Sequence, residues 1–163
     1  MKRFIDYRVR TAQPQDALLL APRLREIDQR ETRAMSGLEP AEALKVSLSR
    51  SSAAWTAKTT EGEVILMWGV GRVGGLLGFV GAPWMLASDI LERPEVGREF
   101  IRLSRPYARV LELGFRRLVN RVHAENRLAI RWLRWLGFSF AEKPERLGGE
   151  EFYIFWKDCV CAS

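Results

Sequence analysis

The sequence has few residues that can bind metals or form disulfides. Of its 163 residues, two are cysteine and one is histidine. Cys159 and Cys161 are separated by one residue, and in a strand this spacing points both thiols to the same face, which is poor geometry for a disulfide. Two thiols and one imidazole do not make a zinc site within one chain. We therefore expect reduced thiols and no metal, the alternative being a metal or disulfide shared between two chains.

The sequence also lacks long apolar runs, repeats and low-complexity segments. No stretch of about 18 uninterrupted apolar residues is present, so no transmembrane helix is expected. Residues 1–8 include basic side chains but no apolar segment of signal-peptide length. A cytosolic protein is expected, and a length of 163 residues suits a single domain spanning residues 1–163.

Basic residues are in excess. Lys and Arg number 26 and Asp and Glu number 20, which gives a net charge of +6. Such a charge favours anionic partners, namely nucleic acid, an acidic protein, an anionic membrane or a phosphorylated cofactor. Charge alone does not choose among them.

Hydrophobic periodicity predicts both strands and helices. Ile5, Tyr7 and Val9 alternate with polar residues as in a half-buried strand, and Gly62 suits a hairpin turn. Strands or short apolar segments are expected at residues 5–9, 55–58, 64–71, 76–87, 118–122, 138–140 and 152–156. Helices are expected at residues 14–35, 40–48, 94–114 and 126–136, with Pro106 either kinking the third or beginning another. This order indicates an α/β fold, an α+β mixed sheet with helices on its faces.

The most informative stretch is residues 119–138, a strand, a helix and the start of another strand. Asn126 can cap the helix by accepting a hydrogen bond from a backbone N–H. Ile130 and Leu133 follow at helical spacing, and Gly137 ends the helix where a left-handed residue is needed. A strand and a helix that meet at polar residues are typical of one half of a binding site.

The order of elements resembles that of the GCN5-related N-acetyltransferase (GNAT) superfamily. Two local patterns carry the resemblance: Arg10-x-Ala12-x-x-x-Asp16, and Asn126-x-x-Ala129 with Gly137-Phe138. The resemblance implies a central, mixed, mostly antiparallel sheet flanked by helices, and transfer of an acetyl group from acetyl-CoA to an amine. It also implies that backbone N–H groups of residues 84–87 polarise the thioester. The residues assigned to cofactor binding on this basis are Trp84, Leu86, Ser88, Arg93, Gly97, Arg98 and Asn126.

The sequence departs from the family's pattern at two places. Active members usually have a glycine-rich motif before the long helix, whose backbone N–H groups hold the cofactor pyrophosphate. Residues 88–98 offer only Arg93, Gly97 and Arg98 for this role, together with three acidic residues. The family's tyrosine, which often protonates the departing thiolate, aligns with Leu133. A leucine cannot donate a proton, so another acid or solvent would have to do so.

Two side chains are candidates for acid–base catalysis. His123 is the only imidazole, and its ordinary pKa would allow it to act as a general base near neutral pH. A surface or hydrogen-bonding role is the alternative for this histidine. Tyr153 is a candidate for the missing acid, as is Tyr107, although Tyr107 lies on the apolar stripe of its helix and is expected in the core.

A narrower resemblance is to GNAT-like internal virion or assembly proteins of short-tailed bacteriophages. It rests on the tryptophan-rich segment Ala129–Phe138 and on Pro83-Trp84, Ser88-Asp89 and Leu103-Ser104-Arg105. It implies a location in the host cytoplasm or the virion, and acidic, virion or host proteins as partners. The expected function is that of a GNAT-fold N-acyltransferase-like protein of phage origin. The alternatives are a catalytically silent virion or assembly protein and a basic nucleic-acid-binding module.

Of two further patterns, one is rejected as a dinucleotide site and the other is kept, but not favoured, as a nucleic-acid site. Residues 69–74 match G-x-G-x-x-G, but no helical pattern follows them, as the dinucleotide fingerprint requires. The tryptophans are more typical of a core or an interface than of base-stacking surfaces, which place exposed aromatic residues beside basic ones.

Overall fold

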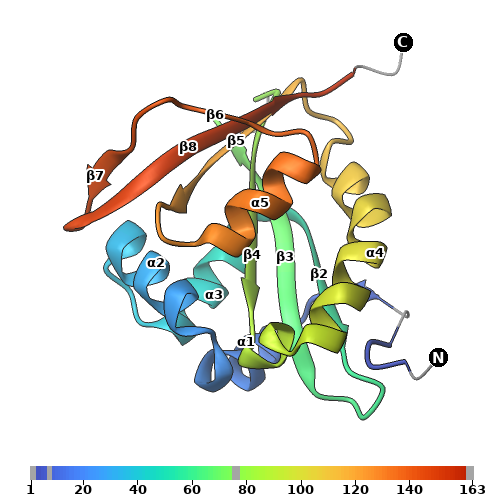
Figure 1. The fold of residues 1–163 in the computed structure, drawn as a ribbon. Helices are drawn as coiled ribbons and strands as arrows, with labels where there is room; N and C mark the ends of the chain where they lie inside the picture. Colours follow the sequence, from blue (N-terminus) through green and yellow to red (C-terminus); the bar gives the residue numbers. More distant parts are fainter. Residues whose placement is uncertain (1–2, 7–8, 75–77, 161–163) are drawn as a thin grey trace.

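An eight-stranded, mostly antiparallel sheet forms the centre of the molecule, with helices on both faces (Figure 1). The structure, a computed structural model, describes residues 3–6, 9–74 and 78–160. The strands run in the order β1-β2-β3-β4-β5-β8-β6, and β7 also pairs with β8. Their bounds are β1 (Arg10–Thr11), β2 (Ser51–Lys58), β3 (Val64–Val73), β4 (Val80–Ala87), β5 (Arg117–His123), β6 (Ser139–Phe140), β7 (Glu145–Leu147) and β8 (Glu150–Asp158). The predicted mixed, mostly antiparallel sheet is confirmed.

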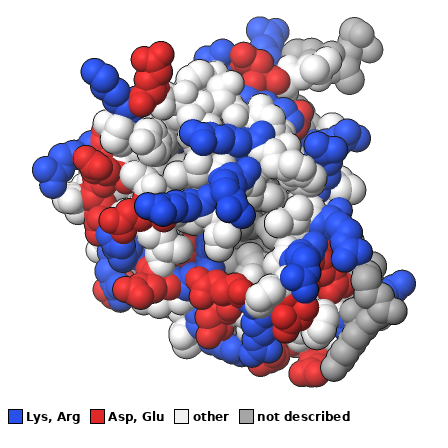
Figure 2. Space-filling model, viewed as in Figure 1, with Lys and Arg blue, Asp and Glu red and all other residues white. Residues whose placement is uncertain are grey.

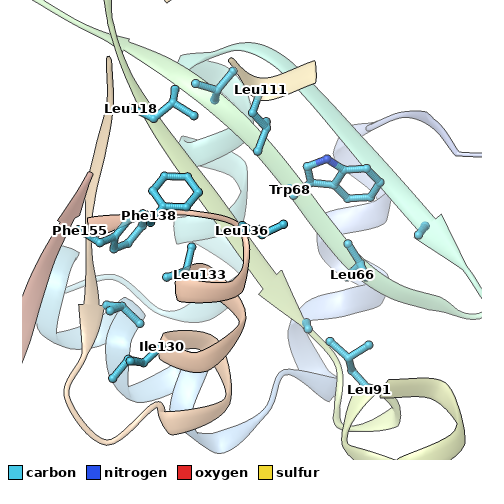
Figure 3. Packing of buried hydrophobic residues seen from close by; sticks show 14 of the residues in the cluster. Leu66, Trp68, Leu91, Leu111, Leu118, Ile130, Leu133, Leu136, Phe138 and Phe155 are labelled. Atoms are coloured by element: carbon cyan, nitrogen blue, oxygen red, sulfur yellow. The ribbon is translucent and has the colours of Figure 1, made fainter. Parts of the chain in front are cut away.

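Two layers of helices cover the sheet and enclose separate apolar clusters. The helices are α1 (Pro14–Leu20), η1 (Ala21–Arg23), α2 (Glu26–Ser36), α3 (Pro40–Arg50), η2 (Asp89–Glu92), α4 (Pro94–Leu111) and α5 (Arg127–Trp135). α1 and α3 pack on one face around Leu20, Leu44 and Met67. α4 and α5 pack on the other face around Trp68, Leu118 and other residues (Figure 3). Among the described residues, no helix is long and apolar enough to cross a membrane.

The N-terminal region differs from the prediction. Among the described residues of the strand expected at residues 5–9, Ile5 forms an isolated bridge with Thr59, and the prediction for Tyr7 lies outside the described residues. The helix expected at residues 14–35 is divided into α1, η1 and α2. Pro22, in the middle of η1, explains the division, because proline has no N–H and its ring clashes with the preceding turn of an α-helix.

The pattern Arg10-x-Ala12-x-x-x-Asp16 has a structural role. The Asp16 carboxylate, 1% exposed, is paired with Arg10 and accepts from the Gln13 N–H at 2.8 Å and the Thr56 hydroxyl at 2.9 Å. These contacts join β1, the start of α1 and β2. The pattern therefore fixes the N-terminal region to the sheet.

Pro106 does not interrupt α4, which is a single helix of 18 residues. Pro106 is exposed, on the solvent side of the helix. The apolar side packs against the sheet through Val96, Leu103 and Leu111. The burial of this side outweighs the loss of one helical hydrogen bond at the proline.

The prediction for α5 is confirmed. The Asn126 side chain accepts from the Ala129 N–H at 3.3 Å, and Gly137 has a φ of 89°, in the left-handed region. Leu133, 7% exposed, points into the core below α5, near Phe138 and Phe155 (Figure 3). The position of the family's tyrosine is thus part of the core.

The C-terminal strands are longer and more numerous than predicted. β7, which follows the predicted turn-rich loop, pairs with β8 through a turn at Gly148 and Gly149, both with positive φ. Cys159 is a free, buried thiol, and Cys161 lies outside the described residues.

Candidate functional site

The sheet opens between its two parallel strands. β4 and β5 pair at only two positions, beginning at Val80 and Arg117, although both strands continue well beyond them. The Asn120 side-chain amide donates to the Pro83 carbonyl at 2.7 Å and bridges the start of the gap. Past this bridge the strands are no longer paired, and a cavity of about 360 Å³ lies along the gap.

Met85 lies in the open stretch of β4, and its side chain lines the cavity. Alternate residues of a strand direct their backbone groups to opposite neighbours. Two residues on, the Ala87 N–H donates to the Asp28 carboxylate at 3.0 Å and not to β3. Two residues back, the Pro83 carbonyl accepts from Asn120. The Met85 N–H and C=O therefore also point away from β3, toward the gap, where no described residue bonds to them.

The wall on the α4–α5 side of the cavity is aromatic and apolar. It includes Phe100, Leu103, Tyr107, Trp132, Leu133 and Leu136. The Trp132 indole N–H donates to the Ser104 hydroxyl at 3.0 Å, and its ring centroid lies 5.3 Å from that of Phe100. These contacts join α4 to α5 and leave an apolar channel between the helices and the sheet.

The wall on the opposite face of the sheet is more polar. Residues 28, 31, 32 and 35 of α2 and residues 43, 46, 47 and 50 of α3 line it, each set at the spacing of one helical stripe. Trp84 and Leu86 of β4 lie between them and pack on the α1–α3 cluster. The cavity therefore extends through the sheet, from the apolar channel to this polar wall.

A buried ion pair stands at the polar end of the cavity. The Arg25 guanidinium donates to both carboxylate oxygens of Asp28, at 2.9 and 2.6 Å. Both residues are at most 5% exposed. The pair holds α2 against the end of β4, because Asp28 also accepts from the Ala87 N–H.

Glu31 is one turn further along α2 and also lines the cavity. Its carboxylate accepts from the His123 backbone N–H at 2.8 Å and from the Asn126 side-chain amide at 3.0 Å. Burial raises the pKa of Glu31, and repulsion from Asp28 adds to the rise, while the two hydrogen bonds and Arg25 oppose it. A cavity-lining carboxyl with a raised pKa suits a proton acceptor.

The His123 side chain is placed outside the cavity. The ring is 1% exposed, its Nδ1 accepts from the Glu125 N–H at 3.1 Å, and its Nε2 lies 3.0 Å from the Glu150 carboxylate. Arg30 binds the same carboxylate through two hydrogen bonds and Glu125 through a third. Hydrogen bonds from Arg30, and then from His123, lower the pKa of Glu150 to about 2. His123, the predicted general base, thus makes structural contacts with Glu150 and Phe152 of β8.

The predicted cofactor residues divide into two groups. Trp84, Leu86 and Asn126 line the cavity, and Asn126 both caps α5 and holds Glu31. The remainder, Ser88, Arg93, Gly97 and Arg98, do not line it, nor does the predicted acid Tyr153. Tyr153 packs against the core cluster.

The residues at the start of α4 form an open, mixed-charge surface. Arg93 and Arg98 are exposed, and so are Glu92 and Glu95. Gly97 has little room, since an added Cβ would lie 3.1 Å from the Leu91 carbonyl oxygen. The N-terminus of α4 attracts anions, whereas the nearby carboxylates repel them. Among the described residues there is no cluster of histidine, cysteine and carboxylate side chains that could hold a metal ion.

A basic surface covers α5. Arg127, Arg131 and Arg134 are exposed along this helix. Figure 2 shows Lys and Arg side chains gathered at the centre of the view, where Figure 1 places α5. The predicted basic face of this helix is therefore on the surface, next to the apolar channel.

Glu31, Asp28 and the Met85 N–H were not predicted individually from the sequence. The signal in the sequence is the set of positions 28, 31 and 32, which are polar at helical spacing where an apolar stripe was expected to continue. Their significance depends on residues far along the chain, because Glu31 bonds to groups 92 and 95 residues away.

No protein-family model matches the sequence, and no curated protein matches it. Solved structures do match the fold. A GCN5-related N-acetyltransferase from Kribbella flavida has 18% sequence identity and a TM-score of 0.67, over 94% of this chain and 97% of that one. The spermidine N-acetyltransferase from Vibrio cholerae, in complex with CoA and spermine, has 11% identity and a TM-score of 0.64, over 95% of each chain.

The ribosomal-protein-S5-alanine acetyltransferase from Vibrio fischeri has 14% identity and a TM-score of 0.61, over 100% of this chain and 97% of that one. At such identities the likeness is one of fold, and function depends on the site. The chain has the fold of the GNAT acetyltransferases.

Proposed function

We propose that the protein transfers an acetyl group from acetyl-CoA to a primary amine. The observation that carries this proposal is the gap between β4 and β5, where the cavity passes through the sheet and the Met85 backbone is unpaired. Such a cavity lets two reactants meet from opposite faces, an apolar one on the α4–α5 side and a polar one on the α2–α3 side. Holding two reactants in this way is itself a large part of catalysis.

The residues at the gap fit the thioester end of the cofactor. Bound acetyl-CoA would supply an activated acetyl group. The Met85 N–H can donate to the carbonyl oxygen, on which negative charge develops during the reaction, and Trp132 and Phe100 exclude water from the channel. The Met85 N–H is one of the backbone donors that the family resemblance implies within residues 84–87.

Glu31 is the proposed general base. The new N–C bond forms as the C–S bond breaks, and the nitrogen loses a proton that Glu31 can accept. A raised pKa makes Glu31 a better proton acceptor than an ordinary carboxylate. Leu133 supplies no proton, so the departing thiolate takes its proton from solvent.

The phosphate end of the cofactor has a weaker site. Arg93 and Arg98 offer positive charge, and the N–H groups of Glu95 and Val96 in the first turn of α4 have no helical partner. The carboxylates of Glu92 and Glu95 oppose phosphate binding at the same place. We therefore expect weaker binding of acetyl-CoA than a glycine-rich phosphate motif would provide.

The phage origin and the catalytically silent assembly role stay predictions from the sequence. The weak phosphate end favours the silent role, whereas the open cavity and the unpaired Met85 backbone favour catalysis. A nucleic-acid-binding role for the basic surface of α5 predicts affinity that falls steeply with salt. A gel shift that is absent at low salt would remove that alternative.

The test uses acetyl-CoA titration and release of free thiol with a panel of primary amines. Replacing Met85 by proline removes the N–H that faces the gap without removing a β3 hydrogen bond, and Met85→Ala is the control for the lost side chain. We expect Met85→Pro to lower kcat/KM by about 100-fold or more relative to Met85→Ala. Absence of acetyl-CoA binding at millimolar concentration would overturn the proposal.

A further inference from the structure

The charges that line the cavity leave one guanidinium uncompensated. Three arginines line it, and two of them are paired, Arg25 with Asp28 and Arg121 with Glu145. Arg50 is exposed and has no carboxylate partner among the described residues. An arginine in this state is a ready binding group for an anion.

Of the two other carboxylates in the lining, Asp6 and Glu31, Asp6 lies too far from Arg50 to neutralise it. Asp6 also lines the cavity, and its backbone N–H donates to the Lys58 carbonyl at the end of β2. Arg50 immediately precedes the first residue of β2. Seven residues of extended strand separate the two ends, which is roughly 23 Å.

Arg50 and Glu31 stand at opposite ends of the polar wall. Arg50 is the last residue of α3 and leads into β2, whereas Glu31 is bonded to residues at the end of β5. The start of β2 and the end of β5 are three strand spacings apart across the sheet, about 14 Å, and about four residues apart along the strands, about 13 Å, which gives roughly 20 Å between their backbones. The long side chains of Arg50 and Glu31 both line the cavity, which leaves a separation on the order of 10 Å between the two charged groups.

Between these two charges the polar wall also carries apolar side chains, which can hold an aliphatic stem. They are those of Met35, Leu38, Val46, Trp84 and Leu86, with Thr32, Ser36 and Ser47 beside them. An acceptor that fits this wall has an aliphatic stem, with its reactive end beside Glu31 and Met85. A second polar group, at the other end of the stem, would lie beside Arg50.

We infer that the acceptor is an aliphatic primary amine with a carboxylate at its far end, which Arg50 binds. This inference rests on the proposed function. The amine is held at the carboxylate end of the cavity, and the guanidinium of Arg50 forms charge-assisted hydrogen bonds with the acceptor's carboxylate. Arg50 is a specificity residue and has no part in the chemical step.

The experiment compares amine pairs of equal length, with and without a terminal carboxylate: γ-aminobutyrate with butylamine, and ε-aminohexanoate with hexylamine. Each is assayed for thiol release with the wild type, Arg50→Gln, Arg50→Lys and the control Lys45→Gln. Lys45 lies on α3, is exposed and does not line the cavity. The control therefore removes one positive charge from the same helix without changing the cavity.

We expect the wild type to prefer the amino acids, with ε-aminohexanoate the better of the two because it spans more of the wall. Arg50→Gln should raise the KM for ε-aminohexanoate about tenfold or more and change kcat little. Arg50→Lys should raise this KM less than Arg50→Gln does. Hexylamine should respond to neither substitution. Equal use of hexylamine and ε-aminohexanoate, with equal response to Arg50→Gln, would overturn the inference and leave acetyl transfer intact. Failure of every amine and of acetyl-CoA binding would instead overturn the proposed function.

Discussion

Glu31 and Glu150 both contact His123, yet their carboxylates lie in opposite environments. Glu31 accepts from the His123 backbone N–H and lines the cavity, where burial raises its pKa. Glu150 lies beside the imidazole outside the cavity, where Arg30 and His123 lower its pKa to about 2. α2 provides both environments, because Arg30 and Glu31 are consecutive residues that face different sides.

The difference separates a site of chemistry from a site of stability. A carboxyl with a raised pKa is prepared to take up a proton, whereas one with a lowered pKa keeps its charge and its ion pairs. The sequence made His123 the candidate general base. We propose that Glu31 takes that role instead.

The largest expected effect comes from Glu31→Gln. The amide keeps an oxygen that can accept from His123 and Asn126, but it cannot take up a proton, so kcat/KM should fall by about 100-fold or more. The raised pKa means that ionising Glu31 costs stability as the pH rises through its folded value. The free energy of unfolding at neutral pH should therefore be unchanged or higher.

Glu26→Gln, at an exposed position of the same helix, is the matched control. Activity assays with saturating amine and denaturation in urea measure the two effects separately. A variant of Glu31 that kept full activity would remove the base from the proposed mechanism.

His123→Ala tests the other side of the comparison. Loss of the buried ring should lower the free energy of unfolding by about 2–4 kcal/mol, because packing and hydrogen bonds with Glu125 and Glu150 are lost. The effect on kcat/KM, measured on protein that remains folded, should be far smaller than that of Glu31→Gln. Loss of activity of 100-fold or so in a folded His123→Ala protein would return the catalytic role to the histidine.

The pH dependence of stability should show the contribution of Glu150. Its ordinary pKa is 4.5 and its folded pKa is about 2, so its stabilising contribution is present above pH 4.5 and is lost as the pH falls from 4.5 to about 2. Urea denaturation between these pH values should show a shallower decline for Glu150→Gln than for the wild type. Parallel profiles would contradict the assigned ion pairs.

The smallest expected effect concerns a third glutamate, Glu95, in the first turn of α4. The negative charge of Glu95 interacts favourably with the dipole of α4 but would repel the phosphates of acetyl-CoA. Glu95→Gln should tighten acetyl-CoA binding about two- to fivefold at low salt, and less at high salt. Glu42→Gln, at the first turn of α3, is the control in isothermal titration. Weaker binding by Glu95→Gln would place the phosphates elsewhere.

Local signals in the sequence predicted much of the fold. The cap at Asn126, the spacing of Ile130 and Leu133 and the stop at Gly137 all act within one helix, and the structure confirms each. Local signals did not decide the outcome where tertiary contacts do. Of the two alternatives for Pro106, a new helix is excluded, because burial of the opposite side keeps α4 continuous, and β7 was not predicted because it depends on β8 as its partner.

The candidate site was less accessible to sequence reasoning than the fold. Asn126 follows from a local pattern and the expected role of residues 84–87 from the family resemblance, but Glu31 becomes important only through contacts with β5 and the start of α5. The His123 backbone N–H makes one of these contacts. The imidazole of His123 suggested a catalytic role because its ordinary pKa suits a general base near neutral pH. Its side chain lies outside the cavity, because the ring packs on Phe152 and its Nε2 lies 3.0 Å from the Glu150 carboxylate.

The most direct test follows the Met85 N–H itself. The chain has four methionines, so selective ¹⁵N-methionine labelling gives few amide signals, and Met85→Ala identifies the one from Met85. On titration with acetyl-CoA, we expect a saturable shift of the Met85 amide signal, while the signal of Met67, which is buried in the β3 ladder, stays in place. Binding of acetyl-CoA that leaves the Met85 amide signal unchanged would contradict a hydrogen bond from the Met85 N–H to the thioester.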